Sequence, residues 1–84
     1  MDEKYIVYGA KWCNFCNKAL DLLDSKSLKY FFADLSDKDD FLKEVKDYYD
    51  SATIPVILRF GESGRVEKVG GFTDLKERLE NEQF

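Results

Sequence analysis

The sequence predicts an α/β fold in which three helices flank a four-stranded mixed sheet, in the order β-α-β-α-β-β-α. Two features support this class: apolar runs alternate with stretches of helical periodicity, and two later apolar runs are joined by a glycine-containing turn. Strands that alternate with helices pair in parallel through right-handed crossovers, whereas strands joined by a short turn pair antiparallel. The 84 residues, 44% of them hydrophobic, are enough for one domain, residues 1–84, with a dense core.

The first predicted unit is a strand followed by a helix. An apolar run over Tyr5–Tyr8 predicts the strand. The helix is expected over Asn14–Ser25, because apolar residues recur there at helical spacing and share one face. The residues of that face are Cys16, Ala19, Leu20 and Leu23.

A second strand and a second helix are predicted next. The apolar run Leu28–Phe32 has the character of a buried strand. Ser36 belongs to the residue types that cap helix N-termini, so we expect it to begin the second helix. The inner face of that helix is expected to carry Phe41, Val45, Tyr48 and Tyr49.

The second half of the chain predicts a hairpin and a third helix. Ile54–Phe60 and Arg65–Val69 are the expected strands, and the turn between them is Gly61-Glu62-Ser63-Gly64. The pair Gly70-Gly71 is expected to end the second strand, because glycine tolerates positive φ angles. Thr73 or a neighbour is the expected helix cap. The residues expected to face inward are Leu75 and Leu79.

Cys13 and Cys16 are the only cysteines, and they lie where the first strand gives way to the first helix. A Cys-x-x-Cys pair at such a junction cycles between dithiol and disulfide. We expect Cys13 at the helix N-terminus, where backbone N–H groups, the macrodipole and nearby Lys11 favour a thiolate. Cys13 is therefore the expected nucleophile, and Cys16, one turn later on the apolar face, is the expected resolving thiol. The alternative is that both are inert core residues.

Charge and composition exclude several classes of function. The chain has 13 basic and 17 acidic residues, and its net charge of −4 argues against binding to nucleic acid. Residues 1–4 lack the basic and apolar parts of a signal peptide, and no apolar run approaches the ~20 residues of a membrane span. We therefore expect a cytoplasmic protein. The chain has no histidine, and no metal site is expected.

Three segments resemble the glutaredoxins, in the order expected for that family. They are Tyr8-Gly9-Ala10-Lys11-Trp12-Cys13-Asn14-Phe15-Cys16, Thr53-Ile54-Pro55-Val56 and Gly70-Gly71-Phe72-Thr73-Asp74-Leu75. The resemblance implies a minimal thioredoxin fold and a glutathione-dependent thiol-disulfide oxidoreductase that reduces protein disulfides and glutathione mixed disulfides. It also implies that glutathione is a co-substrate, that no cofactor is tightly bound, and that a separate glutathione reductase supplies electrons.

The resemblance further implies which residues hold glutathione. The peptide bond before Pro55 is expected to be cis, and Ile54 is expected to pair its backbone with the cysteine part of glutathione. Thr73 and Asp74 would hold the γ-glutamyl end, the pair Gly70-Gly71 would let the ligand approach the backbone closely, and Lys11 would contact a carboxylate. The implied glutathione-binding residues are Lys11, Phe15, Thr53, Ile54, Pro55, Gly71, Thr73 and Asp74. Several of them also have plain structural explanations, as a turn, a helix cap or a solvated lysine.

Some positions depart from the family pattern. Asn14 and Phe15 stand where dithiol glutaredoxins usually have Pro and Tyr, and we expect a changed redox potential because proline presets the first helical turn. Asn14 leaves open a carrier of a glutathione-ligated iron–sulfur cluster. Trp12 is similar to thioredoxin and leaves open an electron donor recharged by thioredoxin reductase. The basic residue common in the family would fall at Ala10, whereas Lys11 lies one place later.

The resemblance also implies the partners. They are glutathione and disulfide-containing proteins, with ribonucleotide reductase as one such substrate by analogy. Neither a nucleic acid nor a membrane is expected as a partner, and the protein is expected to be a monomer.

Overall fold

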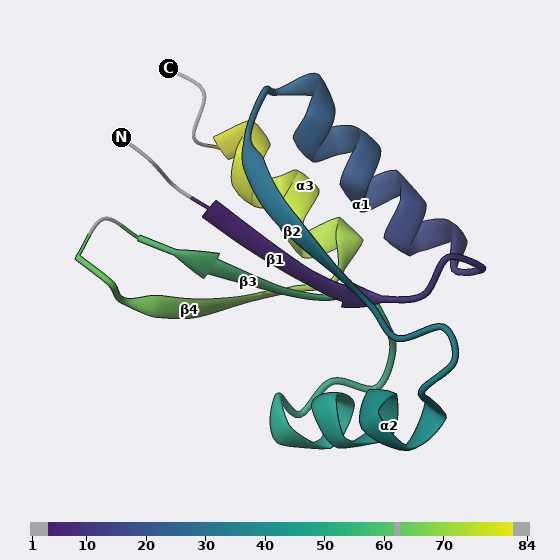
Figure 1. Cartoon of the computed structure of the whole chain (residues 1–84). Coiled ribbons are helices and arrows are strands. Elements are labelled where there is room, and N and C mark those ends of the chain that lie inside the picture. Colours follow the sequence, from purple (N-terminus) through teal and green to yellow (C-terminus); the bar gives the residue numbers. More distant parts are fainter. Residues whose placement is uncertain (1–3, 62, 82–84) are drawn as a thin grey trace.

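The computed structural model describes residues 4–61 and 63–81, and within them it shows the predicted mixed sheet with three helices (Figure 1). The sheet has four strands in the order β2-β1-β3-β4. Along the chain the elements are β1 (Lys4–Gly9), α1 (Asn14–Ser25), β2 (Lys29–Asp34), α2 (Asp39–Tyr48), β3 (Val56–Phe60), β4 (Val66–Gly70) and α3 (Phe72–Asn81). No helix in these two described ranges is both long and apolar enough to cross a bilayer.

The strand register brings three connections to one end of the sheet. β1 runs parallel to β2, and its last residue, Gly9, lies opposite Asp34, the last residue of β2. β3 runs antiparallel to β1, so Val56 at its start lies opposite Tyr8. β4 is antiparallel to β3, which confirms the predicted hairpin. The segments after β1, after β2 and before β3 therefore meet at the same end.

The core has two parts, one on each face of the sheet. Alternate residues of a strand point to opposite faces, so each face has its own set of apolar side chains. On one face, Tyr5 and Val7 of β1 pack with α1 and α3, and on the other face Val56 of β3 packs with α2. Figure 1 shows α1 and α3 side by side, with α2 on the opposite side of the sheet. The buried residues of the larger part are Tyr5, Val7, Ala19, Leu23, Ile57, Leu75 and Leu79.

The prediction that the second strand is buried was wrong. β2 is an edge strand that pairs only with β1, and the side chain of Phe31 is 66% exposed. Its neighbours Tyr30 and Phe32 point the other way and pack on the core between the sheet and α1. An apolar run records how many side chains are apolar, whereas burial on both faces depends on which other elements cover the strand.

The predicted start of the second helix was also wrong, and its inner face was predicted only in part, because Val45 is buried and Tyr49 packs on the core as expected. α2 begins at Asp39 after the N-cap Lys38, and Ser36 makes other hydrogen bonds. The buried residues of α2 are Leu42 and Val45, whereas Phe41 and Tyr48 are 51% and 81% exposed. At about 100° per residue, Leu42 and Val45 lie about 60° apart, and Phe41 and Tyr48 lie about 70° and 90° from their mean direction, on the side of the helix that is turned toward solvent.

The third helix begins at Phe72, so Thr73 lies inside its first turn and is not its cap. Instead the backbone N–H of Gly71 donates to Asp74 Oδ2 at 2.9 Å, a bond that closes the turn entering the helix. Gly70 has φ of +118°, which confirms the expected glycine turn. Leu75 and Leu79 face the core as predicted. Glu62, which was placed in the hairpin turn, lies outside the described residues.

Candidate active site

Cys13 is the N-cap residue of α1, as the sequence predicted. Its φ and ψ of −93° and 115° are extended, and its sulfur accepts a hydrogen bond from the Cys16 N–H at 3.2 Å. The thiol also lies 3.9 Å from the carbonyl oxygen of Ile54, to which it donates. An N-terminal N–H group and the positive end of the helix dipole therefore converge on a partly exposed sulfur. A sulfur in this position is accessible to a disulfide substrate as a nucleophile.

Cys16 is fully buried one helical turn further on. Burial, followed by a hydrogen bond to Cys13, raises the pKa of the Cys16 thiol to about 12. The space for this sulfur exists because Gly9 has no side chain, since a Cβ there would meet the Cys16 sulfur. Neither cysteine is in a disulfide, so the pair is in its reduced form.

A cavity of about 560 Å³ opens next to Ile54, whose carbonyl oxygen contacts the Cys13 thiol. It is lined by residues 50–55, residues 68–74 and the ring of Phe15. The Ile54–Pro55 peptide bond in its wall is cis, as the family resemblance implied. The cavity thus joins the segment before β3, the end of β4 and the start of α3, all beside the N-terminus of α1.

The cavity brings together all but one of the residues implied to bind glutathione. Those that line it are Phe15, Thr53, Ile54, Pro55, Gly71, Thr73 and Asp74. At Gly70 an added Cβ would meet the carboxylate of Asp74, whereas at Gly71 it would meet only the Pro55 carbonyl oxygen at 3.7 Å and Asp74 Oδ2 at 4.0 Å. The backbone at Gly71 is consequently open to a close approach from the cavity.

Aromatic side chains form the rim of the site. The rings of Phe15 and Phe72 have centroids 6.2 Å apart, and Lys18 Nζ lies 5.2 Å from the Phe15 centroid. Trp12, next to Cys13, is 64% exposed. Sequence reasoning missed Phe72 and Lys68 as lining residues. The signal for Phe72 was its place directly after the glycine pair, whereas Lys68 reaches the cavity only through the position of β4.

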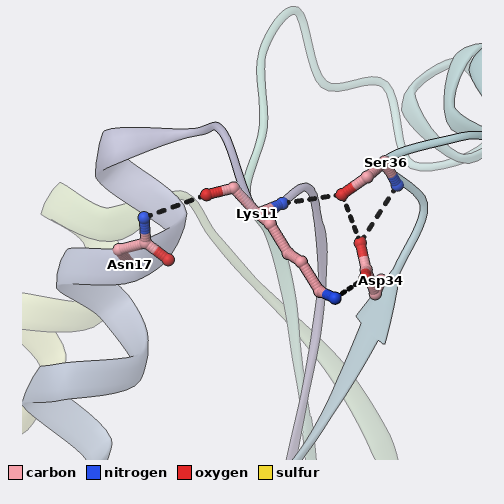
Figure 2. A network of polar contacts seen from close by, with 4 residues as sticks. All are labelled: Lys11, Asn17, Asp34 and Ser36. Carbon is pink, nitrogen blue, oxygen red and sulfur yellow. Dashed lines mark hydrogen bonds and ion pairs between the residues drawn. The ribbon is translucent and has the colours of Figure 1, made fainter.

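Lys11 does not line the cavity, although it lies two residues from Cys13. Its Nζ forms an ion pair with Asp34 Oδ2 at 3.5 Å, its N–H donates to Ser36 Oγ at 2.8 Å, and Asn17 Nδ2 donates to its carbonyl oxygen at 3.2 Å (Figure 2). Two hydrogen bonds from Ser36, followed by the charge of Lys11, hold the pKa of the Asp34 carboxyl below its usual value. Sequence reasoning assigned Ser36 to a helix cap and gave Asp34 no role.

Residues 5–62 match the family model described as Glutaredoxin. The chain belongs to the glutaredoxin family. The matched range of this glutaredoxin includes both cysteines and the segment around the cis-proline, Pro55. Among curated proteins, none matches this chain.

Solved structures are similar to this glutaredoxin in fold. The holo form of glutaredoxin C1 from Populus tremula x tremuloides has a TM-score of 0.76 at 19% identity, over 92% of this chain and 68% of that one. Buckwheat glutaredoxin, solved as a complex with glutathione, has a TM-score of 0.73 at 17% identity, over 94% and 70%. Glutaredoxin 1 from Francisella tularensis, solved with cacodylate, has a TM-score of 0.68 at 20% identity, over 94% of each chain.

The TM-scores show that the chain has a thioredoxin-like fold, and at identities of 17–20% the fold is all that these comparisons show. The family membership adds thiol oxidoreductase chemistry in general. The described residues contain no group of three or more His, Cys, Asp or Glu side chains arranged to hold a metal ion.

Proposed function

We propose that this glutaredoxin is a glutathione-dependent oxidoreductase that reduces protein disulfides and glutathione mixed disulfides through Cys13 and Cys16. The observation that carries this proposal is the position of the Cys13 sulfur. It caps α1, accepts the Cys16 N–H, and lies against the Ile54 carbonyl at the wall of an open cavity. A disulfide placed in that cavity presents a sulfur atom to a nucleophile that is held at a helix N-terminus.

The reaction is a pair of thiol-disulfide exchanges. In the first, the Cys13 thiolate attacks one sulfur of the substrate disulfide, a new sulfur–sulfur bond forms, and the other substrate sulfur leaves as a thiolate that takes up a proton. In the second, either glutathione attacks the outer sulfur of a Cys13–glutathione disulfide, which forms oxidised glutathione and releases the Cys13 thiolate, or Cys16 attacks the Cys13 sulfur, which closes the Cys13–Cys16 disulfide and releases the bound group as a thiolate that takes up a proton. Two glutathione molecules then reopen that disulfide and leave as oxidised glutathione, which glutathione reductase returns to the thiol.

The cavity offers groups for two of the three residues of glutathione. The backbone of Ile54 faces Cys13 and is available to the cysteine residue of glutathione. Gly71, Thr73 and Asp74 are available to its γ-glutamyl end, with the Asp74 carboxylate for the amine. Buckwheat glutaredoxin, which shares this fold, was solved as a complex with glutathione, which supports binding of the same ligand here.

The burial of Cys16 favours a route through Cys13 alone for small glutathione mixed disulfides. A thiol with a pKa of about 12 is almost entirely protonated at neutral pH, and the protonated form is a poor nucleophile. Cys16 then serves mainly for protein disulfides, where the bound substrate stays attached long enough for a slow intramolecular attack. The partners that we propose for the protein are glutathione and disulfide-containing proteins, and the proposed location is the cytoplasm.

The test compares wild type, Cys13→Ser and Cys16→Ser on a glutathione mixed disulfide of a small thiol, with glutathione and glutathione reductase as the electron source. We expect Cys13→Ser to lose activity by at least about 1000-fold, because the nucleophile is gone. Cys16→Ser is expected to keep full or partial activity. Activity in Cys13→Ser equal to wild type would contradict the proposal. Turnover with thioredoxin reductase and none with glutathione would instead favour a thioredoxin-like donor.

A further inference from the structure

Lys11, the charged residue nearest to Cys13 in the sequence, forms an ion pair with Asp34. Lys11 Nζ lies 3.5 Å from Asp34 Oδ2, and the side chain of Lys11 is 78% exposed. The ammonium group is therefore open to solvent, on a residue two positions before Cys13, while its charge is offset by the carboxylate (Figure 2). Asp34 comes from the end of β2, which the parallel register places opposite the end of β1.

The carboxylate is held in place by a serine two residues later. Asp34 Oδ1 accepts hydrogen bonds from the Ser36 N–H at 3.0 Å and from the Ser36 hydroxyl. With Oδ1 occupied in this way, Oδ2 faces Lys11. These hydrogen bonds also favour the charged form, so Asp34 carries its negative charge at neutral pH.

The backbone of Lys11 is fixed from two sides. Its N–H donates to Ser36 Oγ, from the connection after β2, and its carbonyl oxygen accepts from Asn17 Nδ2 on α1. Both backbone polar groups are thus bonded to side chains, one of them 25 residues away. The backbone of Lys11 and the carboxylate of Asp34 are both bonded to Ser36, so the two residues are held next to each other by hydrogen bonds additional to their ion pair.

We propose that Asp34 is a specificity-determining residue, which weakens the preference of this site for anionic disulfides by offsetting the charge of Lys11. The inference rests on the proposed function. A substrate carboxylate that approaches Lys11 gains little attraction, because the negative charge of Asp34 offsets that of the lysine. A neutral or cationic disulfide gains no attraction from Lys11 in the first place, so Asp34 does not weaken its binding. The substrate class favoured by this pair is a disulfide whose groups near the reacting sulfur are neutral or positive.

The test measures single-turnover rate constants of the reduced protein with three small disulfides of similar length. They are dithiodipropionate, which is anionic, hydroxyethyl disulfide, which is neutral, and cystamine, which is cationic. In Asp34→Asn we expect the rate constant with the anion to rise about 2- to 5-fold and that with the cation to fall by a similar factor. A 5-fold change corresponds to about 1 kcal/mol at 1.36 kcal/mol per factor of ten. The neutral disulfide is expected to react as with wild type.

Two further variants isolate the pair. Lys11→Gln leaves Asp34 without its partner and is expected to shift the rates the opposite way, and the double variant Lys11→Gln/Asp34→Asn is expected to return close to wild type. Asp37→Asn is the matched control, because it removes the same charge from an exposed residue on the same connection, for which the described residues show no ion pair. It is expected to leave the ratio of the three rates unchanged.

The outcomes separate the two proposals. If wild type fails to react with any of the three disulfides, the proposed function is wrong. If wild type reacts and Asp34→Asn changes all three rates by the same factor, Asp34 has a structural role only and the inference is overturned. An equal shift in Asp37→Asn would also overturn it, because the effect would then come from net charge.

Discussion

Gly9, the last residue of β1, makes room for the second sulfur of the site. A Cβ at this position would meet the Cys16 sulfur and would lie 3.2 Å from the Cys16 Cβ, in a region where both residues are buried. The buried position of the Cys16 thiol therefore requires a glycine at position 9. A larger residue at position 9 displaces either the strand or the first turn of the helix that Cys13 caps.

We predict that Gly9→Ala lowers the free energy of unfolding by about 1–3 kcal/mol, because overpacking a buried site displaces well-packed atoms. Urea denaturation of the reduced protein measures the change. In a Cys16→Ala background the loss is expected to be smaller, since the sulfur is gone. Gly61→Ala is the control, because its added Cβ would make only an ordinary contact, 3.8 Å from the Arg65 carbonyl oxygen. Equal losses in both backgrounds would contradict the role given to the sulfur.

At the residue scale, the sequence located the reacting atoms but not the polar groups around them. Cys13 was predicted at a helix start, and it is the N-cap of α1. Ser36 was assigned to a cap because serine has that preference, whereas its hydroxyl binds Asp34 and Lys11. A local preference predicts a local bond, and the contact with a residue 25 positions away depends on the parallel pairing of β1 with β2.

At the scale of elements, one acidic residue joins two strands to a helix. Glu67 on β4 accepts from Arg59 on β3 at 2.9 Å and from two nitrogens of Arg78 on α3, at 3.1 and 2.9 Å. Both arginine side chains are largely buried, with 22% and 25% exposed. Hydrogen bonds from Arg78, followed by those from Arg59, lower the pKa of the Glu67 carboxyl below its ordinary value of 4.5. The hairpin and α3, which form one wall of the cavity, are held together by this group.

We predict that Glu67→Gln lowers the melting temperature at pH 7 and that this difference disappears in acid. The carboxylate binds its proton less readily in the folded protein than in the unfolded one, so its contribution is present above pH 4.5 and is lost as the pH falls through the lowered pKa. Thermal unfolding of both proteins from pH 7 to pH 2.5 measures the difference. Glu77→Gln, on an exposed position of α3, is the control. A difference that persists at pH 2.5 would show that shape, and not charge, matters at this position.

The elements themselves were largely predictable, because each has a local signal. The bounds of α1 were predicted as found, and the glycine pair correctly ended the hairpin. The errors concern how elements are covered. The position of β2 at the edge follows from the sheet order, and the exposure of Phe41 and Tyr48 follows from how α2 packs on the sheet, neither of which local periodicity contains.

At the scale of the whole molecule, the net charge of −4 acts on every approaching substrate. Charges of this size steer small ions over about one Debye length, which is ~10 Å at 0.1 M salt. This field is distinct from the local pair of Lys11 and Asp34, because it comes from the whole acidic surface and is screened by salt.

We predict opposite salt effects for oppositely charged disulfides on the wild-type protein. Between 20 and 500 mM salt, the rate constant with cystamine is expected to fall about 2-fold and that with dithiodipropionate to rise about 2-fold, as screening removes the long-range term. Hydroxyethyl disulfide, which is neutral, is the control and is expected to be insensitive. Stopped-flow mixing measures all three. A fall in the rate with the anion would mean that a local positive field outweighs the overall charge.

Trp12 is the only tryptophan, its indole is largely exposed, and it is bonded through the chain to the residue that reacts. Sulfur in a disulfide quenches indole emission by contact, so the colour and intensity of light from this one ring follow the chemistry of its neighbour. The protein thereby carries a built-in optical label. Each covalent step at Cys13 can be watched in the native chain, with no dye attached to the thiols under study.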